Sequence, residues 1–160
     1  MLLTSVVHAT KHDASIMIDR TLFGPLDAAN PPQPAAAIML DVLRSEGVRY
    51  IFGNPGTTEM PLINALDGVQ DISYVLGLQE TSVVAMADGY ATVSGRAGFV
   101  NVHTAGGLGH AMGALIHSRI ANTPLVITAG QQDTRHTVID PLLGGDPSTL
   151  PVRLSNGPAK

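Results

Sequence analysis

The stretch Gly77-Leu-Gln-Glu80-Thr-Ser-Val-Val-Ala-Met-Ala-Asp88-Gly-Tyr90-Ala91 places a carboxylic acid between an apolar strand and an apolar helix. The preceding residues, 71–76, are rich in β-branched and aromatic side chains, which predicts a short strand. The residues after Glu80 are apolar at helical spacing: Val83, Val84, Ala87 and Ala91. Glu80 is therefore either a first-turn acid that interacts favourably with the helix dipole, or a catalytic acid at the mouth of a parallel sheet.

Length and composition favour one globular domain, because 160 residues with 44% hydrophobic content can bury a sizeable core. Nine Lys and Arg against 13 Asp and Glu give a net charge of −4 without a basic run, which argues against nucleic acid or an anionic membrane as partner. The absence of cysteine excludes a disulfide framework and a thiolate metal site. With no signal-peptide pattern and no stretch of transmembrane length, we expect a cytoplasmic protein.

The proline cluster Asn30-Pro-Pro-Gln-Pro34 divides the chain. We expect an N-terminal extension over residues 1–34, one domain over 35–146 and an irregular tail over 147–160. His8 and His12 are four residues apart beside Asp13, but no further ligand lies near this group in the sequence, so we interpret them as solvated histidines and predict no metal site.

Within the domain, short apolar strands alternate with helices. Strands are predicted over residues 48–52, 71–76, 97–103 and 124–128. Helices are predicted over 35–46, from a Thr57 or Thr58 cap to Leu66, over 80–94 and from about His110 to Ile120. This alternation predicts an α/β fold, a parallel sheet flanked by helices on both faces.

Polar and glycine-rich segments follow each predicted strand directly: 54–58, Glu80, 103–109 and 130–133. In a parallel sheet these segments meet at one edge, where ligands bind. Singly, Asn54-Pro55-Gly56 is explained by a turn and His103 by a hydrogen-bonded strand end. Together, an acid, an imidazole, a hydroxyl and glycine-rich backbone indicate a site.

A dinucleotide site is the competing interpretation of the run Gly107-x-Gly109-x-x-x-Gly113 with Asp133 after the next strand. The pattern is a weak signal, because it lies in the third strand–helix unit. In addition, no tyrosine is followed four residues later by lysine, as a short-chain reductase requires.

Five motifs resemble a known family. They are Phe52-Gly-Asn-Pro-Gly-Thr-Thr-Glu59, Leu78-Gln-Glu80, Met86-Ala-Asp-Gly-Tyr-Ala91, the run from Asn101 to Leu115, and Pro124-Leu-Val-Ile-Thr-Ala-Gly-Gln-Gln132. Their order is similar to the N-terminal pyrimidine-binding domain of thiamine diphosphate enzymes. Benzoylformate decarboxylases are the most similar members, followed by acetolactate synthase large subunits.

The resemblance implies a role for each matching residue. Glu80 would share a proton with N1′ of the aminopyrimidine, which promotes loss of the thiazolium C2 proton; burial favours the protonated carboxyl that this step needs. His103 would transfer protons near a 2-oxo acid substrate, and Thr57 would contact the substrate carboxylate in place of a serine. Asn54, Pro55 and Gly56 would shape the loop beside the cofactor, and Gly107 would let backbone approach it.

The resemblance also implies what is lacking. In the family a separate domain holds the diphosphate and a magnesium ion through Gly-Asp-Gly and a later Asn, whereas here Gly145-Asp146 is followed by proline. We therefore expect a diphosphate-binding domain or subunit as partner, in a homo- or hetero-oligomer. The chain is interpreted as either one subunit of a split enzyme or a truncated or frameshifted product, with truncation slightly preferred, and we expect it to be inactive alone. Its function is interpreted as the pyrimidine-binding half of a 2-oxo acid decarboxylase or carboligase. The alternatives are a fragment of an acetolactate synthase-like large subunit and a non-catalytic module of the same fold.

Overall fold

The computed structural model describes residues 6–9, 34–133, 135–136, 139 and 145. Its five strands form one sheet in the order β1-β5-β4-β2-β3. The strands are β1 (Val6–Ala9), β2 (Tyr50–Asn54), β3 (Ser73–Leu76), β4 (Gly98–Val102) and β5 (Leu125–Ala129). Strands β2 to β5 run parallel, and β1 adds to β5 in the antiparallel direction.

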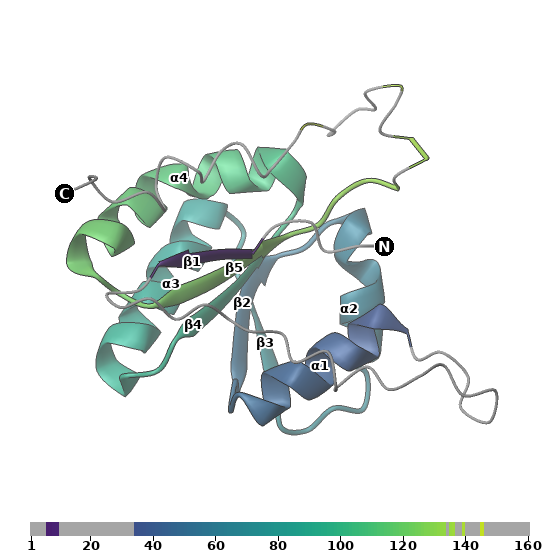
Figure 1. The fold of residues 1–160 in the computed structure, drawn as a ribbon, viewed down its shortest axis with the longest axis horizontal. Coiled ribbons are helices and arrows are strands. Elements are labelled where there is room, and N and C mark those ends of the chain that lie inside the picture. Colours follow the sequence, from purple (N-terminus) through teal and green to yellow (C-terminus); the bar gives the residue numbers. More distant parts are fainter. Residues whose placement is uncertain (1–5, 10–33, 134, 137–138, 140–144, 146–160) are drawn as a thin grey trace.

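Helices cover both faces of this sheet (Figure 1). Helices α1 (Ala35–Ser45) and α2 (Met60–Ala65) lie on one face, with the short 3-10 turn η2 (Thr57–Glu59) before α2. Helices α3 (Glu80–Ser94) and α4 (Thr104–Ala121) lie on the other face. The predicted α/β fold with a parallel sheet between two helical layers is confirmed.

Each face of the sheet has its own apolar core, because alternate strand residues point in opposite directions. In β4, Val100 and Val102 pack with α3 and α4, whereas Phe99 packs with α1 and α2. All five residues of β4 are buried. Continuous burial is the pattern of a central strand in a sheet covered on both sides.

The predicted start of α4 is wrong. The helix begins at Thr104 and not near His110, so the glycine-rich run that we expected as a loop forms the first turns of the helix. The Gly107 amide already donates to the His103 carbonyl oxygen over 2.9 Å. Glycine disfavours a helix by about 1 kcal/mol relative to alanine, but here its small size lets the helix approach β4 and α3 closely.

The predicted cap of the helix that follows β2 is also wrong. Gly56 precedes η2, and neither Thr57 nor Thr58 caps a helix with its side chain. The Thr58 hydroxyl instead donates to the Glu59 carboxylate over 2.7 Å.

Four residues of the predicted N-terminal extension belong to the sheet, since β1 pairs with β5 from Val6–Thr128 to Ala9–Leu125. The boundary at residue 34 stays a prediction. Two further predictions lie outside the described residues: the tail at 147–160 and the interpretation of His8 together with His12.

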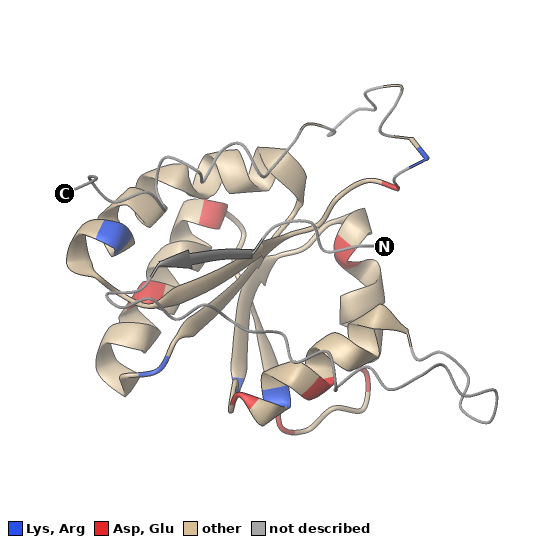
Figure 2. Ribbon diagram, viewed as in Figure 1, with Lys and Arg blue, Asp and Glu red and all other residues tan. Residues whose placement is uncertain are grey.

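The charged residues of the described part are dispersed over several elements, and they form no basic stripe there (Figure 2). No helix in this part of the chain has the length and apolar character needed to cross a membrane.

A chain of hydrogen bonds crosses the sheet on the α1–α2 face. The Tyr74 hydroxyl on β3 donates to Asn101 Oδ1 on β4 over 3.1 Å, and Asn101 Nδ2 donates to Thr128 Oγ1 on β5 over 3.0 Å. Burial raises the pKa of Tyr74, and the nearby charge of Glu59 acts in the same direction, so the phenol stays a neutral donor. Gly53 makes this path possible, because β2 lies between β3 and β4 and Gly53 has no side chain there.

Gly53→Ala is expected to destabilise the fold by about 1–3 kcal/mol, the usual cost of overpacking a core. A methyl group at Gly53 would overlap the Tyr74 phenol and lie 2.6 Å from the Asn101 carbonyl oxygen. The measurement is urea unfolding followed by circular dichroism.

Gly89→Ala is the matched control, because Gly89 lies within α3 and a methyl group there meets no atom within 4 Å. This variant should be stabilised by up to about 1 kcal/mol through helix propensity. Equal stability of the two variants would contradict the packing of Tyr74 over Gly53.

Candidate active site at the carboxyl ends of the strands

Glu80 lies at the first position of α3, directly after the turn that leaves β3. The helix starts here because the Gln79 side chain accepts a hydrogen bond from the Ser82 amide over 2.9 Å, which caps the helix. Glu80 is 8% exposed. A buried carboxyl needs hydrogen-bond partners, since its removal from water is otherwise costly.

Two side chains from different elements hold the Glu80 carboxyl. Asn54 Nδ2, at the end of β2, donates to Oε1 over 3.0 Å. His110 Nδ1, in α4, lies 3.2 Å from Oε2. Gly107 of α4 packs against this carboxyl, since a methyl group there would lie 3.4 Å from Oε1, which is close to an ordinary contact distance. Glu80 is thus more than an acid that interacts with a helix dipole.

A second buried acid, Glu59, holds the predicted site residue His103. Glu59 is 1% exposed, and its Oε2 lies 2.8 Å from His103 Nδ1. The Gly56 amide donates to the same Oε2 over 2.9 Å, and the Thr58 hydroxyl donates to Oε1 over 2.7 Å. Three donors therefore satisfy this carboxylate.

This network assigns the tautomer of His103. A carboxylate accepts hydrogen bonds, so neutral His103 carries its proton on Nδ1 and leaves Nε2 as the acceptor. The Thr58 hydroxyl lies 3.0 Å from Nδ1 but has its own acceptor in Glu59. Glu59 thus holds one ring nitrogen of His103, and Nε2 is the ring nitrogen that can accept a proton.

Glycines fit closely around this second cluster. A methyl group at Gly56 would overlap the imidazole of His103, and one at Gly130, directly after β5, would overlap Glu59 and Thr58. The segment 54–56 joins the two clusters, since Asn54 contacts Glu80 and Gly56 contacts His103 and Glu59. Residues that follow β2, β3, β4 and β5 therefore meet at one edge of the sheet, as predicted.

The two threonines of the 54–58 segment have different surroundings. Thr57, the predicted substrate contact, is exposed, whereas Thr58 is buried between Glu59 and His103. Pro55 is half-buried between the two clusters.

Glu59 belongs to this cluster although it was not among the predicted site residues. A signal was present, because an acid three residues after Gly56 has the spacing of a side chain that returns to the backbone amide at the start of a helix. The structure shows this hydrogen bond.

Thr104 is strained at the junction of β4 and α4. It has a φ of 55°, a left-handed conformation that is rare for a β-branched residue. Its hydroxyl is buried and has no hydrogen-bond partner within the described residues. Backbone strain of this kind concentrates at functional sites.

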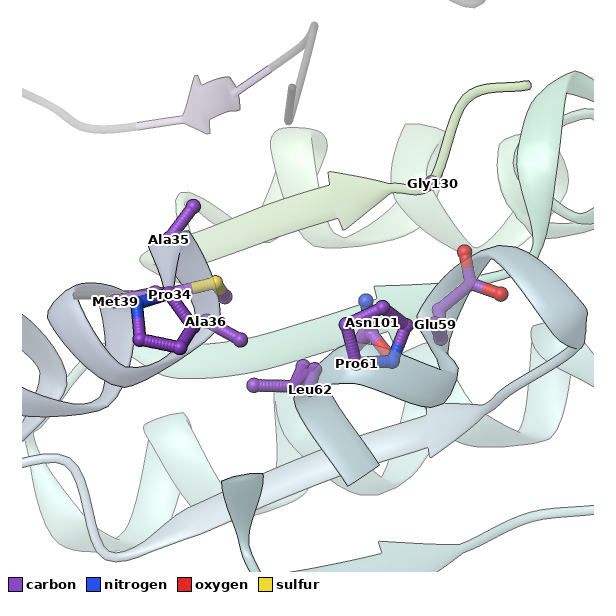
Figure 3. A pocket seen from close by; sticks show the side chains of 9 residues that line it. All are labelled: Pro34, Ala35, Ala36, Met39, Glu59, Pro61, Leu62, Asn101 and Gly130. Atoms are coloured by element: carbon purple, nitrogen blue, oxygen red, sulfur yellow. The ribbon is translucent and has the colours of Figure 1, made fainter. Parts of the chain in front are cut away.

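An apolar cavity of about 250 Å³ lies between α1 and α2 (Figure 3). The Glu59 carboxyl is at one end and is turned toward Gly130, while Pro34 and Met39 lie toward the other end. Glu59 thus forms part of the wall between this cavity and His103.

The described residues give no support for a dinucleotide site at Asp133 or for a metal site. Asp133, part of the dinucleotide interpretation, pairs with Arg135, whose hydrogen bond lowers the pKa of Asp133. Within the described residues, no group of three or more His, Asp or Glu side chains is placed to hold a metal ion.

Comparison with known proteins matches residues 34–147 to the model of the thiamine pyrophosphate enzyme, N-terminal TPP binding domain. Benzoylformate decarboxylase of Pseudomonas aeruginosa is 45% identical over 123 residues, which cover 74% of this chain and 23% of that protein. The acetolactate synthase large subunit of Haemophilus influenzae is 33% identical over 111 residues, which cover 69% of this chain and 18% of that protein.

Among solved structures, a thiamine diphosphate-dependent 4-hydroxybenzoylformate decarboxylase of Rhodococcus jostii matches with a TM-score of 0.70 and 42% identity, over 74% of this chain and 22% of that one. The chain spans less than a quarter of the length of each of these three proteins. The chain belongs to the thiamine pyrophosphate enzyme family, in which it corresponds to the N-terminal cofactor-binding domain.

Proposed function

We propose that this chain is the pyrimidine-binding half of a thiamine diphosphate-dependent decarboxylase of 2-oxo acids, and that a diphosphate-binding domain must complete it. The observation that carries the proposal is the Glu80 carboxyl, which is buried at the sheet edge and held by Asn54 and His110. The similarity to benzoylformate decarboxylase supports the reaction class.

The residues at this edge fit the aminopyrimidine end of the cofactor. A ring nitrogen that must gain and lose a proton needs a fixed carboxyl with a free lone pair or proton, and Glu80 is fixed from two sides. Gly107 packs against it, and the Asn54–Gly56 segment forms the adjoining wall. Thiamine diphosphate, when bound, supplies a carbon nucleophile and an electron sink for decarboxylation.

Glu80 moves one proton in this mechanism. With the cofactor bound, the Glu80 carboxyl would hold or release a proton toward the aminopyrimidine, and the hydrogen bond from Asn54 would keep the carboxyl oriented. The position at the start of α3 fixes the backbone that carries this acid, so orientation costs little at the moment of reaction.

His103 moves the proton on the substrate side. Glu59 holds Nδ1, so Nε2 can take a proton from the reacting group or return it. Thr57, exposed beside this pair, contacts the carboxylate of the 2-oxo acid.

Binding of the diphosphate and its metal ion requires groups other than the described residues of this chain. The diphosphate and magnesium are held by another domain or subunit, which makes the active site a shared one. The names of the relatives favour an aryl 2-oxo acid, and the His103–Glu59 pair supports decarboxylation. Similarity to acetolactate synthase supports carboligation of a small 2-oxo acid as the second candidate.

Glu80→Gln tests the proposed role. A chimera would carry residues 34–147 in place of the matching segment of the Pseudomonas aeruginosa enzyme. In this chimera the variant should keep the fold and slow exchange of the cofactor's C2 proton by about 100-fold or more, because an amide cannot take the proton. The measurement is quenched-flow exchange in deuterated water followed by NMR.

Glu46→Gln, a change of the same kind at an exposed position after α1, is the control and should leave exchange unchanged. Unchanged exchange in Glu80→Gln would remove the proposed function. A folded chimera with no exchange in any version would favour the non-catalytic module instead.

Glu59→Gln is expected to lower turnover of benzoylformate by about 10–100-fold, since a partner that orients a functional histidine has an effect of that size. Exchange at C2, which depends on Glu80, should stay within a few fold of the parent chimera. The two rates are compared in the same preparation.

The split between the two rates is the decisive result. A parallel loss of both rates would mean that Glu59 supports the fold of the whole edge and does not act through His103.

A further inference from the structure

We infer that His110 is a positioning residue for Glu80. The imidazole of His110 holds the Glu80 carboxyl in both of its protonation states and connects it to solvent. This inference rests on the proposed role of Glu80. The two side chains differ in exposure to solvent: that of Glu80 is 10% exposed, whereas that of His110 is 71% exposed. His110 therefore stands between a buried acid and water.

The position of His110 is built into the packing of two helices. The Thr81 hydroxyl, next to Glu80 in α3, donates to the His110 carbonyl oxygen over 2.8 Å. This bond ties the α4 turn that carries His110 to the first turn of α3. His110 Nδ1 then reaches Glu80 Oε2 at 3.2 Å without a long flexible side chain.

The chemistry of the two partners of Glu80 differs. Asn54 Nδ2 is a donor only, so its hydrogen bond to Oε1 is made to an acceptor oxygen. An imidazole nitrogen can donate or accept, depending on the tautomer. Of the two side chains that hold the carboxyl, His110 is thus the one that can adapt when Glu80 gains a proton.

The adaptation is a balanced transfer of one proton. With Glu80 charged, Nδ1–H donates to Oε2. When Nε2 takes a proton from water and the Nδ1 proton passes to Oε2, the hydrogen bond remains with its direction reversed: Oε2–H donates to Nδ1. The reverse sequence returns the proton to water, and His110 is neutral at both ends of the transfer.

Two other ionisable groups near these helices make hydrogen bonds away from the His110–Glu80 pair. Asp88, further along α3, accepts hydrogen bonds from Thr92 and Thr123 through Oδ1. His103 at the start of α4 pairs with Glu59. Within the described residues, Glu80 is the acid that His110 contacts.

The test is NMR of the 160-residue chain itself, without cofactor, labelled with 13C at the glutamate carboxyl. The sequence has three glutamates, so loss of one signal in Glu80→Gln assigns Glu80. Over a pH titration, the Glu80 signal should show its own inflection and a second one that coincides with the titration of the His110 ring. His110→Gln should abolish the second inflection.

His117→Gln is the matched control, because His117 is exposed on the same helix and makes no side-chain hydrogen bond within the described part of the chain. It should keep both inflections. A wild-type Glu80 signal with one inflection, or a second inflection that survives in His110→Gln, would overturn the inference. Should His110→Gln fail to fold, the wild-type titration alone decides.

Failure here is distinguishable from failure of the proposed function. The NMR titration reports contact between His110 and Glu80 in the absence of cofactor, whereas C2 exchange reports what Glu80 does to the cofactor.

Discussion

Two carboxyl groups, those of Glu59 and Glu80, are buried at one edge of the sheet, and the structure around them depends on how they are hydrogen-bonded. A buried carboxyl is tolerated only with hydrogen-bond partners close by, and here those partners come from residues that follow different strands. Glycines at 56 and 130 stand where a side chain would overlap Glu59, Thr58 or the histidine that Glu59 holds. The two carboxyl groups can therefore be buried only because these segments approach one another closely.

Much of this arrangement was readable from the sequence. The alternation of apolar strands and helices predicted the parallel sheet, and the rule for strand ends predicted that the segments around Asn54, Glu80 and His103 would meet. The location of Glu80 at the start of a helix followed from the switch between a strand pattern and a helical pattern.

Other features depended on tertiary contacts that local patterns do not encode. The run 104–109 has low helix propensity, yet it is helical, and Gly107 within it packs against β4 and Glu80. The spacing of Glu59 from Gly56 encodes its bond to the Gly56 amide, but local patterns do not encode its contact with His103, which lies 44 residues further along the chain. The left-handed Thr104 and the contact of His110 with Glu80 likewise depend on how α4 packs against its neighbours.

We propose that this chain supplies groups for proton transfer and that another domain or subunit holds the diphosphate. Isothermal titration calorimetry of thiamine diphosphate with magnesium tests this division most directly, using the 160-residue chain alone and the chimera with the Pseudomonas aeruginosa enzyme side by side. The account predicts no saturable binding to the chain alone and magnesium-dependent binding, micromolar or tighter, to the chimera. Micromolar, magnesium-dependent binding by the chain alone would contradict it.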